Sequence, residues 1–241
     1  MEKISDENLV TCRVDKTKKL AKVLQLVPFI DCIILNGSLA YNEAKKSSDV
    51  DILIITNFGR VFTVRFIITL ITSILVLKRS SNENKSHAGK FCFNYYLTDE
   101  FLEIPHHRSQ EVNAYCAENY SQSILIWGDN KIFNNYFKTN YAWMEKYLLN
   151  PESQAQKEFP LQENYVSEQF PVNTIKARRI GGWWERRLTG IFGDWFEFQV
   201  KRFQIWLIEK DARTWKYQDY IVYNDRELRF HPPTKGKFKN I

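Results

Sequence analysis

Two aspartates, separated by one residue, stand at the start of an apolar run in this chain: Asp49 and Asp51 open the stretch DVDILIIT. Side chains two positions apart on a strand point to the same face, so a strand here places both carboxylates together. Neighbouring carboxylates repel each other unless a cation joins them. Hard divalent ions prefer oxygen ligands and keep positions for water and phosphate oxygens. The pattern therefore predicts a two-carboxylate site for Mg²⁺ or Mn²⁺.

A Gly-Ser pair precedes these aspartates. Gly37-Ser38 ends the apolar run Cys32–Leu35, and glycine permits backbone conformations that other residues avoid. We expect Ser38 to cap a helix over residues 39–46, where the N–H groups at the helix start would be available to a phosphate. A phosphate cradle facing a two-carboxylate metal site is suited to phosphoryl transfer, because positioning and charge neutralisation supply most of that catalysis.

The apolar strand, Gly37-Ser38, ten intervening residues and the second strand with Asp49 and Asp51 together resemble the signature of the DNA polymerase β-type nucleotidyltransferase superfamily. The resemblance implies transfer of a nucleoside monophosphate from a nucleoside triphosphate to an unidentified hydroxyl-type acceptor, with release of pyrophosphate. The sequence does not identify the acceptor: a small molecule, a protein side chain and an RNA end are all open. The residues implied are the catalytic metal ligands Asp49 and Asp51 and the nucleotide-binding residues Gly37, Ser38, Ser48 and Asn94.

Asn94 departs from the superfamily pattern, in which the strand after the motif commonly contributes a third acidic residue. Asparagine can coordinate a metal or hydrogen-bond a phosphate, but it accepts no proton at pH 7. An alternative is therefore a nucleotide- or RNA-binding module on the same scaffold with weak or no catalysis. A third possibility is a coincidental match in an α/β protein of another function. The run Phe91–Tyr95 and the preceding apolar helix are also similar to bacterial nucleotidyltransferase-like proteins without an assigned substrate.

The composition is that of a globular protein with a basic bias. The 241 residues carry a formal net charge of +6, and 15% of them are aromatic. The positive charge favours anionic partners such as nucleotides or nucleic acid. The four cysteines are dispersed without a C-x-x-C pair, which indicates free thiols. The polar N-terminus lacks the apolar core of a signal peptide, so we expect a cytoplasmic protein.

The resemblance implies an α+β fold, a small mixed sheet with flanking helices (the nucleotidyltransferase fold), and hydrophobic spacing predicts a mainly helical C-terminal region after it. The expected strands cover residues 32–35, 49–55 and 91–97, and the expected helices cover residues 18–27, 61–77, 111–126, 131–149 and 194–209. The run 61–77 is shorter than the ~20 apolar residues of a membrane span and contains Arg65, so we expect no membrane insertion. Arg65 itself is either a charge near the triphosphate or a side chain that reaches the surface.

The predicted division is a catalytic domain over residues 1–105 and a mainly helical C-terminal region with a short strand-containing tail over residues 106–241. Proline-containing residues 150–171 are expected to be a linker. Residues 176–187 (KARRIGGWWERR) contain two tryptophans between two clusters of basic residues. They either bind nucleic acid or form an ordinary solvated helix face.

Overall fold

The computed structural model describes residues 6–40, 44–75, 88–105, 110–148 and 175–230. Within these residues the chain forms one six-stranded mixed sheet in the order β4-β1-β2-β3-β6-β5. Its strands are β1 (Ile30–Asn36), β2 (Val50–Thr56), β3 (Phe91–Thr98), β4 (Ile124–Gly128), β5 (Val222–Tyr223) and β6 (Glu227–Arg229). Only β2 and β3 pair in parallel, and all other neighbours are antiparallel. The predicted α+β fold with a mixed sheet is confirmed.

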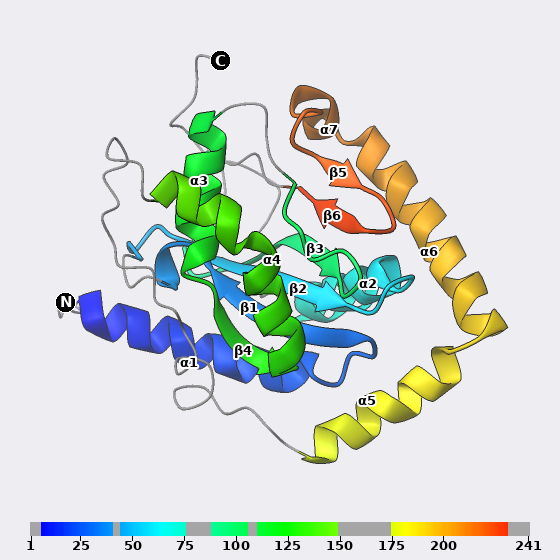
Figure 1. The fold of residues 1–241 in the computed structure, drawn as a ribbon. Helices are drawn as coiled ribbons and strands as arrows, with labels where there is room; N and C mark the ends of the chain where they lie inside the picture. The colour runs from blue at the N-terminus through cyan, green and yellow to red at the C-terminus, as the bar shows by residue number, and fades with distance from the viewer. Residues whose placement is uncertain (1–5, 41–43, 76–87, 106–109, 149–174, 231–241) are drawn as a thin grey trace.

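Helices cover both faces of this sheet (Figure 1). One face, which we call the α2 face, packs against α1 (Asp6–Leu24), α2 (Val61–Ile74) and α6 (Ile191–Lys210). The other face, the α3 face, packs against α3 (Gln110–Ser121) and α4 (Asn130–Leu148). The short 3₁₀ helix η1 (Gly37–Leu39) follows β1, α5 (Ile175–Leu188) precedes α6, and α7 (Ala212–Lys216) precedes the β5–β6 hairpin.

The central strands β1, β2 and β3 are apolar over most of their length because both of their faces are buried. Ile52 and Ile54 of β2 lie in the core on the α2 face, and Leu53 and Ile55 lie in the core on the α3 face. The N-terminal end of β2 is polar, and Asp51 there is half-buried. The sheet thus presents the predicted carboxylates at one end of an otherwise dry strand.

Buried polar contacts attach α6 to the N-terminal end of α2. The carboxylate of Glu197 accepts hydrogen bonds from the backbone N–H groups of Phe62 (3.0 Å) and Thr63 (2.7 Å). Gln204 accepts from the guanidinium of Arg65 and donates to the carbonyl of Phe62. Because Arg65 lies on the α2 face and bonds to α6, the structure supports neither a triphosphate contact nor full exposure for this side chain.

Three expected helices are wrong in extent. The helix expected over residues 18–27 begins at Asp6 and ends at Leu24. The helix expected over residues 39–46 is replaced by η1, and residues 44–49 are not helical. The helix expected to reach residue 126 ends at Ser121, because residues 124–126 belong to β4, which pairs with β1. Backbone pairing with a sheet edge here outweighs local helix propensity. The expected linker at 150–171 lies outside the described residues.

The sheet takes strands from both sides of residue 105, since β4, β5 and β6 follow it in the chain. The domain division at that residue stays a prediction. No helix in the described part of the chain is long and apolar enough to cross a membrane. All four cysteines are free thiols, as expected from their spacing.

Candidate active site

The two predicted carboxylates lie at the N-terminal end of β2. Asp49 immediately precedes the strand, and Asp51 is its second residue. Asp51 is flanked by Asn36 on β1 and by Cys92 on β3, its register partners in the sheet. Both aspartates are half-buried. Their carboxylates can therefore reach a ligand that approaches from solvent while the backbone on either side stays fixed by strand pairing.

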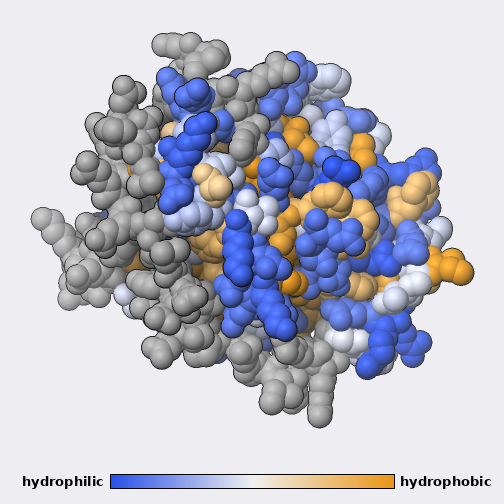
Figure 2. Space-filling view, in the orientation of Figure 1, coloured by the Kyte–Doolittle hydropathy of each residue, from blue (hydrophilic) through white to orange (hydrophobic). Residues whose placement is uncertain are grey.

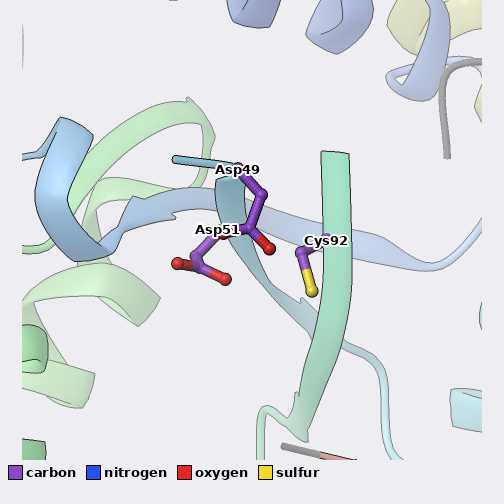
Figure 3. A group of neighbouring side chains, drawn as sticks. All are labelled: Asp49, Asp51 and Cys92. Atoms are coloured by element: carbon purple, nitrogen blue, oxygen red, sulfur yellow. The ribbon is translucent and has the colours of Figure 1, made fainter. Parts of the chain in front are cut away.

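Cys92 joins the two carboxylates. One carboxylate oxygen from each of Asp49 and Asp51 and the sulfur of Cys92 lie within 4.8 Å of one another. Figure 3 shows the three side chains gathered at the adjoining ends of β2 and β3. Cys92 is 9% exposed, as expected for a buried thiol, but its position beside the aspartates was not predicted from the sequence. The parallel register of β2 and β3 brings Cys92 beside the aspartates, and the spacing of residues along the chain does not reveal that register.

Gly37 lies against Asp51. Its φ is +70°, and a Cβ built on it would lie 2.7 Å from Oδ2 of Asp51. Glycine is needed here twice, because the left-handed conformation disfavours other residues and the carboxylate fills the space of a side chain. The turn η1 and the aspartate strand are thus packed in direct contact, as the phosphate-cradle prediction requires.

The segment before Asp49 is held by hydrogen bonds within itself and by hydrogen bonds from α1. The side-chain oxygen of Ser48 accepts from the backbone N–H of Lys45 (3.0 Å), which closes a turn. Arg13 of α1, only 4% exposed, donates to the carbonyls of Lys45 (2.8 Å) and Lys46 (2.8 Å). Burial lowers the pKa of Arg13, and the charge of Asp49 partly offsets that effect. Arg13 therefore anchors the segment that presents Asp49.

A β-bulge in β3 turns Asn94 toward the site. The register of β2 against β3 shifts between the pairs Asp51–Cys92 and Leu53–Tyr95. Phe93 and Tyr96 lie in the core on the α2 face, which leaves the two residues between them for the opposite face. A bulge inserts one extra residue and so re-aims side chains. Both Asn94 and Tyr95 line the same pocket as Asp51.

This pocket lies between the α3 face of the sheet and α3. Gly37 and Asp51 line it, so the glycine turn and one carboxylate open directly into it. The other lining side chains include four tyrosines and several amides: Tyr95, Tyr115, Tyr120, Tyr220, Asn36, Asn94, Asn113 and Asn119. Three other predicted residues do not line the pocket: Asp49, Ser38 and Ser48. Asp49 nevertheless lies next to the pocket-lining Asp51, in the group that these two carboxylates form with Cys92.

Arg229 brings a positive charge to this pocket from the C-terminal hairpin. It pairs with Tyr95 across β3 and β6, and its guanidinium lies 3.7 Å from the carboxylate of Glu227. Glu227 in turn accepts a hydrogen bond from the buried hydroxyl of Tyr95 (3.0 Å). The Nε atom of Arg229 is buried without a hydrogen-bond partner among the described residues. Arg229 was not predicted from the sequence, since only the sheet order places β6 beside β3.

Burial dominates the electrostatics of the pocket wall. It raises the pKa of Tyr115 and Tyr120, and the negative charge of Asp51 adds to both shifts. Burial raises the pKa of Cys116 to about 11, although the positive charge of Arg229 acts in the opposite direction. These groups are therefore neutral at physiological pH. Of the pocket-lining residues, the charged ones are Asp51 and Arg229.

The donor atoms fit a divalent cation. Carboxylate oxygens are the ligands that Mg²⁺ and Mn²⁺ prefer, and two of them here are close enough to share one ion. The sulfur of Cys92 is a softer donor, which suits Mn²⁺ or Zn²⁺ better than Mg²⁺. Asp49 and Asp51 are thus the residues that would hold the metal, with Cys92 at its edge.

Comparison with known proteins agrees with this geometry. Residues 17–105 match the family model described as a nucleotidyltransferase domain, and this range includes Gly37, Asp49, Asp51 and Cys92. Neither the curated proteins nor the solved structures contain a match to the chain. Over residues 17–105 the chain is therefore similar to nucleotidyltransferase domains, consistent with a member of the polymerase β-type nucleotidyltransferase superfamily.

Proposed function

We propose that this protein is a metal-dependent nucleotidyltransferase that moves a nucleoside monophosphate from a nucleoside triphosphate to an acceptor hydroxyl. The observation that carries the proposal is the contact of the Gly37 turn with Asp51, next to Asp49, inside the segment that matches the nucleotidyltransferase domain. A phosphate-binding turn and a pair of carboxylates are brought together at one end of a strand. Nucleotidyl transfer requires that combination.

In this proposal Asp49 and Asp51 hold Mg²⁺ or Mn²⁺, which when bound supplies positive charge that stabilises the triphosphate and the leaving pyrophosphate. The backbone of the Gly37–Leu39 turn and the hydroxyl of Ser38 bind the β- and γ-phosphates. The acceptor oxygen forms its bond to the α-phosphorus while the bond from that phosphorus to the bridging oxygen breaks. Pyrophosphate leaves with the electron pair, and the acceptor hydroxyl releases its proton to solvent water.

The pocket beside Asp51 accommodates the organic part of a substrate. Its tyrosine rings offer stacking surfaces and its amides offer hydrogen bonds, as in small-molecule sites that combine apolar walls with a few polar groups. In this proposal Asn94, which lines the pocket next to the bulge, hydrogen-bonds the nucleotide. Arg229, held by Glu227, faces the same pocket and is assigned to an anionic group of the bound triphosphate.

A second candidate function is nucleotide binding without efficient transfer. It is favoured by Cys92, which pairs with Asp51 on the neighbouring strand and lies beside both carboxylates. A thiol there contributes no third carboxylate, so no additional oxygen ligand or proton acceptor comes from that position. This candidate predicts binding of triphosphates with little release of pyrophosphate.

The experiment that separates the two candidates is incubation of the purified protein with each α-labelled nucleoside triphosphate, Mg²⁺ or Mn²⁺, and a cell extract. Transfer of label to an extract component, together with pyrophosphate release, supports the enzyme. The variants Asp49→Asn and Asp51→Asn should abolish transfer while their unfolding temperatures stay near that of the parent protein. Triphosphate binding that persists without pyrophosphate release supports the binding module. Transfer that survives in both variants contradicts the assignment of these carboxylates.

A further inference from the structure

The outer surface of α5, α6 and α7 exposes an unusual number of aromatic rings. Five of the seven tryptophans lie between residues 183 and 215. The most exposed side chains include Ile191 (91%), Trp215 (68%) and Phe192 (59%). We call this surface the aromatic–basic face and define it by Trp183, Trp184, Ile191, Phe192, Trp195, Phe198, Phe203, Trp206, Leu207 and Trp215, together with the cations Arg186, Arg187, Arg202 and Lys210.

Helical spacing puts this face opposite the buried side of α6. Gly193, Glu197, Val200, Gln204 and Ile208 form the buried stripe. Phe192, Trp195, Arg202, Trp206 and Lys210 recur at intervals of three, seven, four and four residues, which gathers them on one side of the helix. All five are exposed. In Figure 1 α6 runs along the outer edge of the molecule, and hydrophobic residues are visible at that edge in Figure 2.

Positive charge is interleaved with these rings. Lys210 lies 3.8 Å from the ring centre of Trp206, and Arg202 lies 5.5 Å from that of Phe198. Residues 175–216 contain ten lysines and arginines and five acidic residues. Four of those five acids make contacts within the protein: Glu185 bonds to Phe29, Asp194 to Arg60, Glu197 to the start of α2, and Asp211 to the start of α7. Lys201 and Arg213 are also paired, with Asp225 and Asp211, but the segment keeps an excess of five positive charges, and the face is therefore complementary to a negatively charged partner.

We propose that the aromatic–basic face binds the surface of an anionic lipid membrane, with α6 lying in the plane of the interface. Helices that bind in this way combine tryptophan, phenylalanine and leucine with lysine and arginine, and they bury their apolar side chains about 5–10 Å into the headgroup region. Tryptophan is enriched at that depth because its ring is apolar and its N–H is polar. This binding needs no spanning helix.

Two other occupants fit the observations less well. A second copy of the chain would bring like charges together across the contact, which opposes association. RNA stacks on aromatic rings, but the exposed aliphatic side chains of Ile191 and Leu207 offer nothing to a base. Moreover, α6 packs over the α2 face of the sheet, whereas the candidate pocket lies on the α3 face. An RNA bound to α6 would not lie over that pocket, while a membrane bound there leaves the pocket accessible.

The test is flotation of the full-length protein with vesicles of phosphatidylcholine alone and of phosphatidylcholine containing phosphatidylglycerol. We expect binding to the anionic vesicles, weakened by salt. The double variant Trp195→Ala/Trp206→Ala should lower the partition coefficient about tenfold because it removes buried apolar area. Arg202→Gln/Lys210→Gln should lower it about fivefold for each charge removed. All four side chains are exposed, so these variants are expected to keep the parent unfolding temperature.

The matched control is Lys131→Gln/Lys138→Gln, which removes two exposed lysines from α4 on the opposite face of the sheet. It should leave vesicle binding nearly unchanged. The proposal is overturned if anionic vesicles do not bind the protein, or if the control variant loses as much binding as the α6 variants. It is also overturned if the tryptophan variant instead abolishes RNA binding or dissociates a dimer while vesicle binding is unaffected.

Discussion

Gly37 and Asp51 occupy adjoining space: a Cβ on the glycine would lie 2.7 Å from a carboxylate oxygen of the aspartate. The glycine belongs to the turn after β1, and the aspartate belongs to the neighbouring strand β2. The position of one therefore sets the position of the other. This contact links the expected phosphate-binding turn to the expected metal ligand, and it can be tested by adding one methyl group.

Replacing Gly37 with alanine should displace the Asp51 carboxylate and strongly reduce transfer. Alanine in the left-handed conformation of this residue should also lower the unfolding free energy by about 1–2 kcal/mol. Gly59→Ala is the matched control, since Gly59 has φ +75° but no atom within 4 Å of an added Cβ. Thermal unfolding and transfer assays on both variants separate strain from displacement. Equal activity in the two variants would contradict a role for the contact.

Cys92→Asp should convert the thiol corner of the site into a third carboxylate. Without divalent ions the added negative charge beside Asp49 and Asp51 should lower the unfolding temperature. With Mg²⁺ the variant should bind the ion about tenfold more tightly, equivalent to about 1.4 kcal/mol, because ligand charge raises affinity for hard cations. The unfolding temperature is measured across a Mg²⁺ titration, with Cys92→Ser as the neutral control. A Mg²⁺ dependence identical in both variants would argue against a metal at this group.

Arg229→Gln should weaken triphosphate binding about tenfold to a hundredfold, the range expected for losing a hydrogen bond to a charged group. Arg226→Gln removes the same charge from the same hairpin, but Arg226 is exposed and does not line the pocket. Titration of each protein with a triphosphate gives the dissociation constants. If the two variants bind equally well, the assignment of Arg229 to an anionic group of the substrate is wrong.

Asp31 should make stability depend on pH. Burial, together with the nearby charge of Asp99, raises the pKa of Asp31 to about 7, despite a hydrogen bond from Asn57. The folded protein thus keeps a proton that the unfolded chain loses above about pH 4, so this stabilising contribution is complete below that pH and disappears as the pH rises through about 7.

Asp31→Asn removes that titration. We expect the unfolding free energy of the variant, relative to the parent protein, to increase between about pH 4 and pH 7 and to level off above that range. Denaturant unfolding at several pH values measures the difference between the two proteins, which cancels the titration of other groups. A constant difference across this range would show that Asp31 titrates normally in the folded state.

Glu197→Ala should destabilise the protein by about 2–3 kcal/mol, because it leaves the buried N–H groups of Phe62 and Thr63 without their acceptor. Glu197→Gln keeps one acceptor oxygen and should cost less. The measurement is the free energy of unfolding in denaturant. A loss below that of an exposed control such as Glu209→Ala would show that water replaces the carboxylate at the start of α2.

The sequence by itself determined the local parts of this protein. The apolar runs that become β1, β2, β3 and α2 are long and strongly patterned, and Gly37, Asp49 and Asp51 are close enough in the chain to be recognised as one motif. Spacing along a single strand fixes which carboxylates share a face, so that prediction needs no tertiary information. The fold class followed from the same elements.

Only the tertiary structure decided what lies beside the motif. Cys92 meets the carboxylates through the parallel register of β2 and β3, Asn94 reaches the pocket through a bulge, and Arg229 arrives on a strand from the far end of the chain. Strand pairing joins residues that are distant in sequence. A one-residue shift in register reverses the face that a side chain occupies. Residues 124–126 became a strand for the same reason, because the edge of β1 supplied the hydrogen bonds.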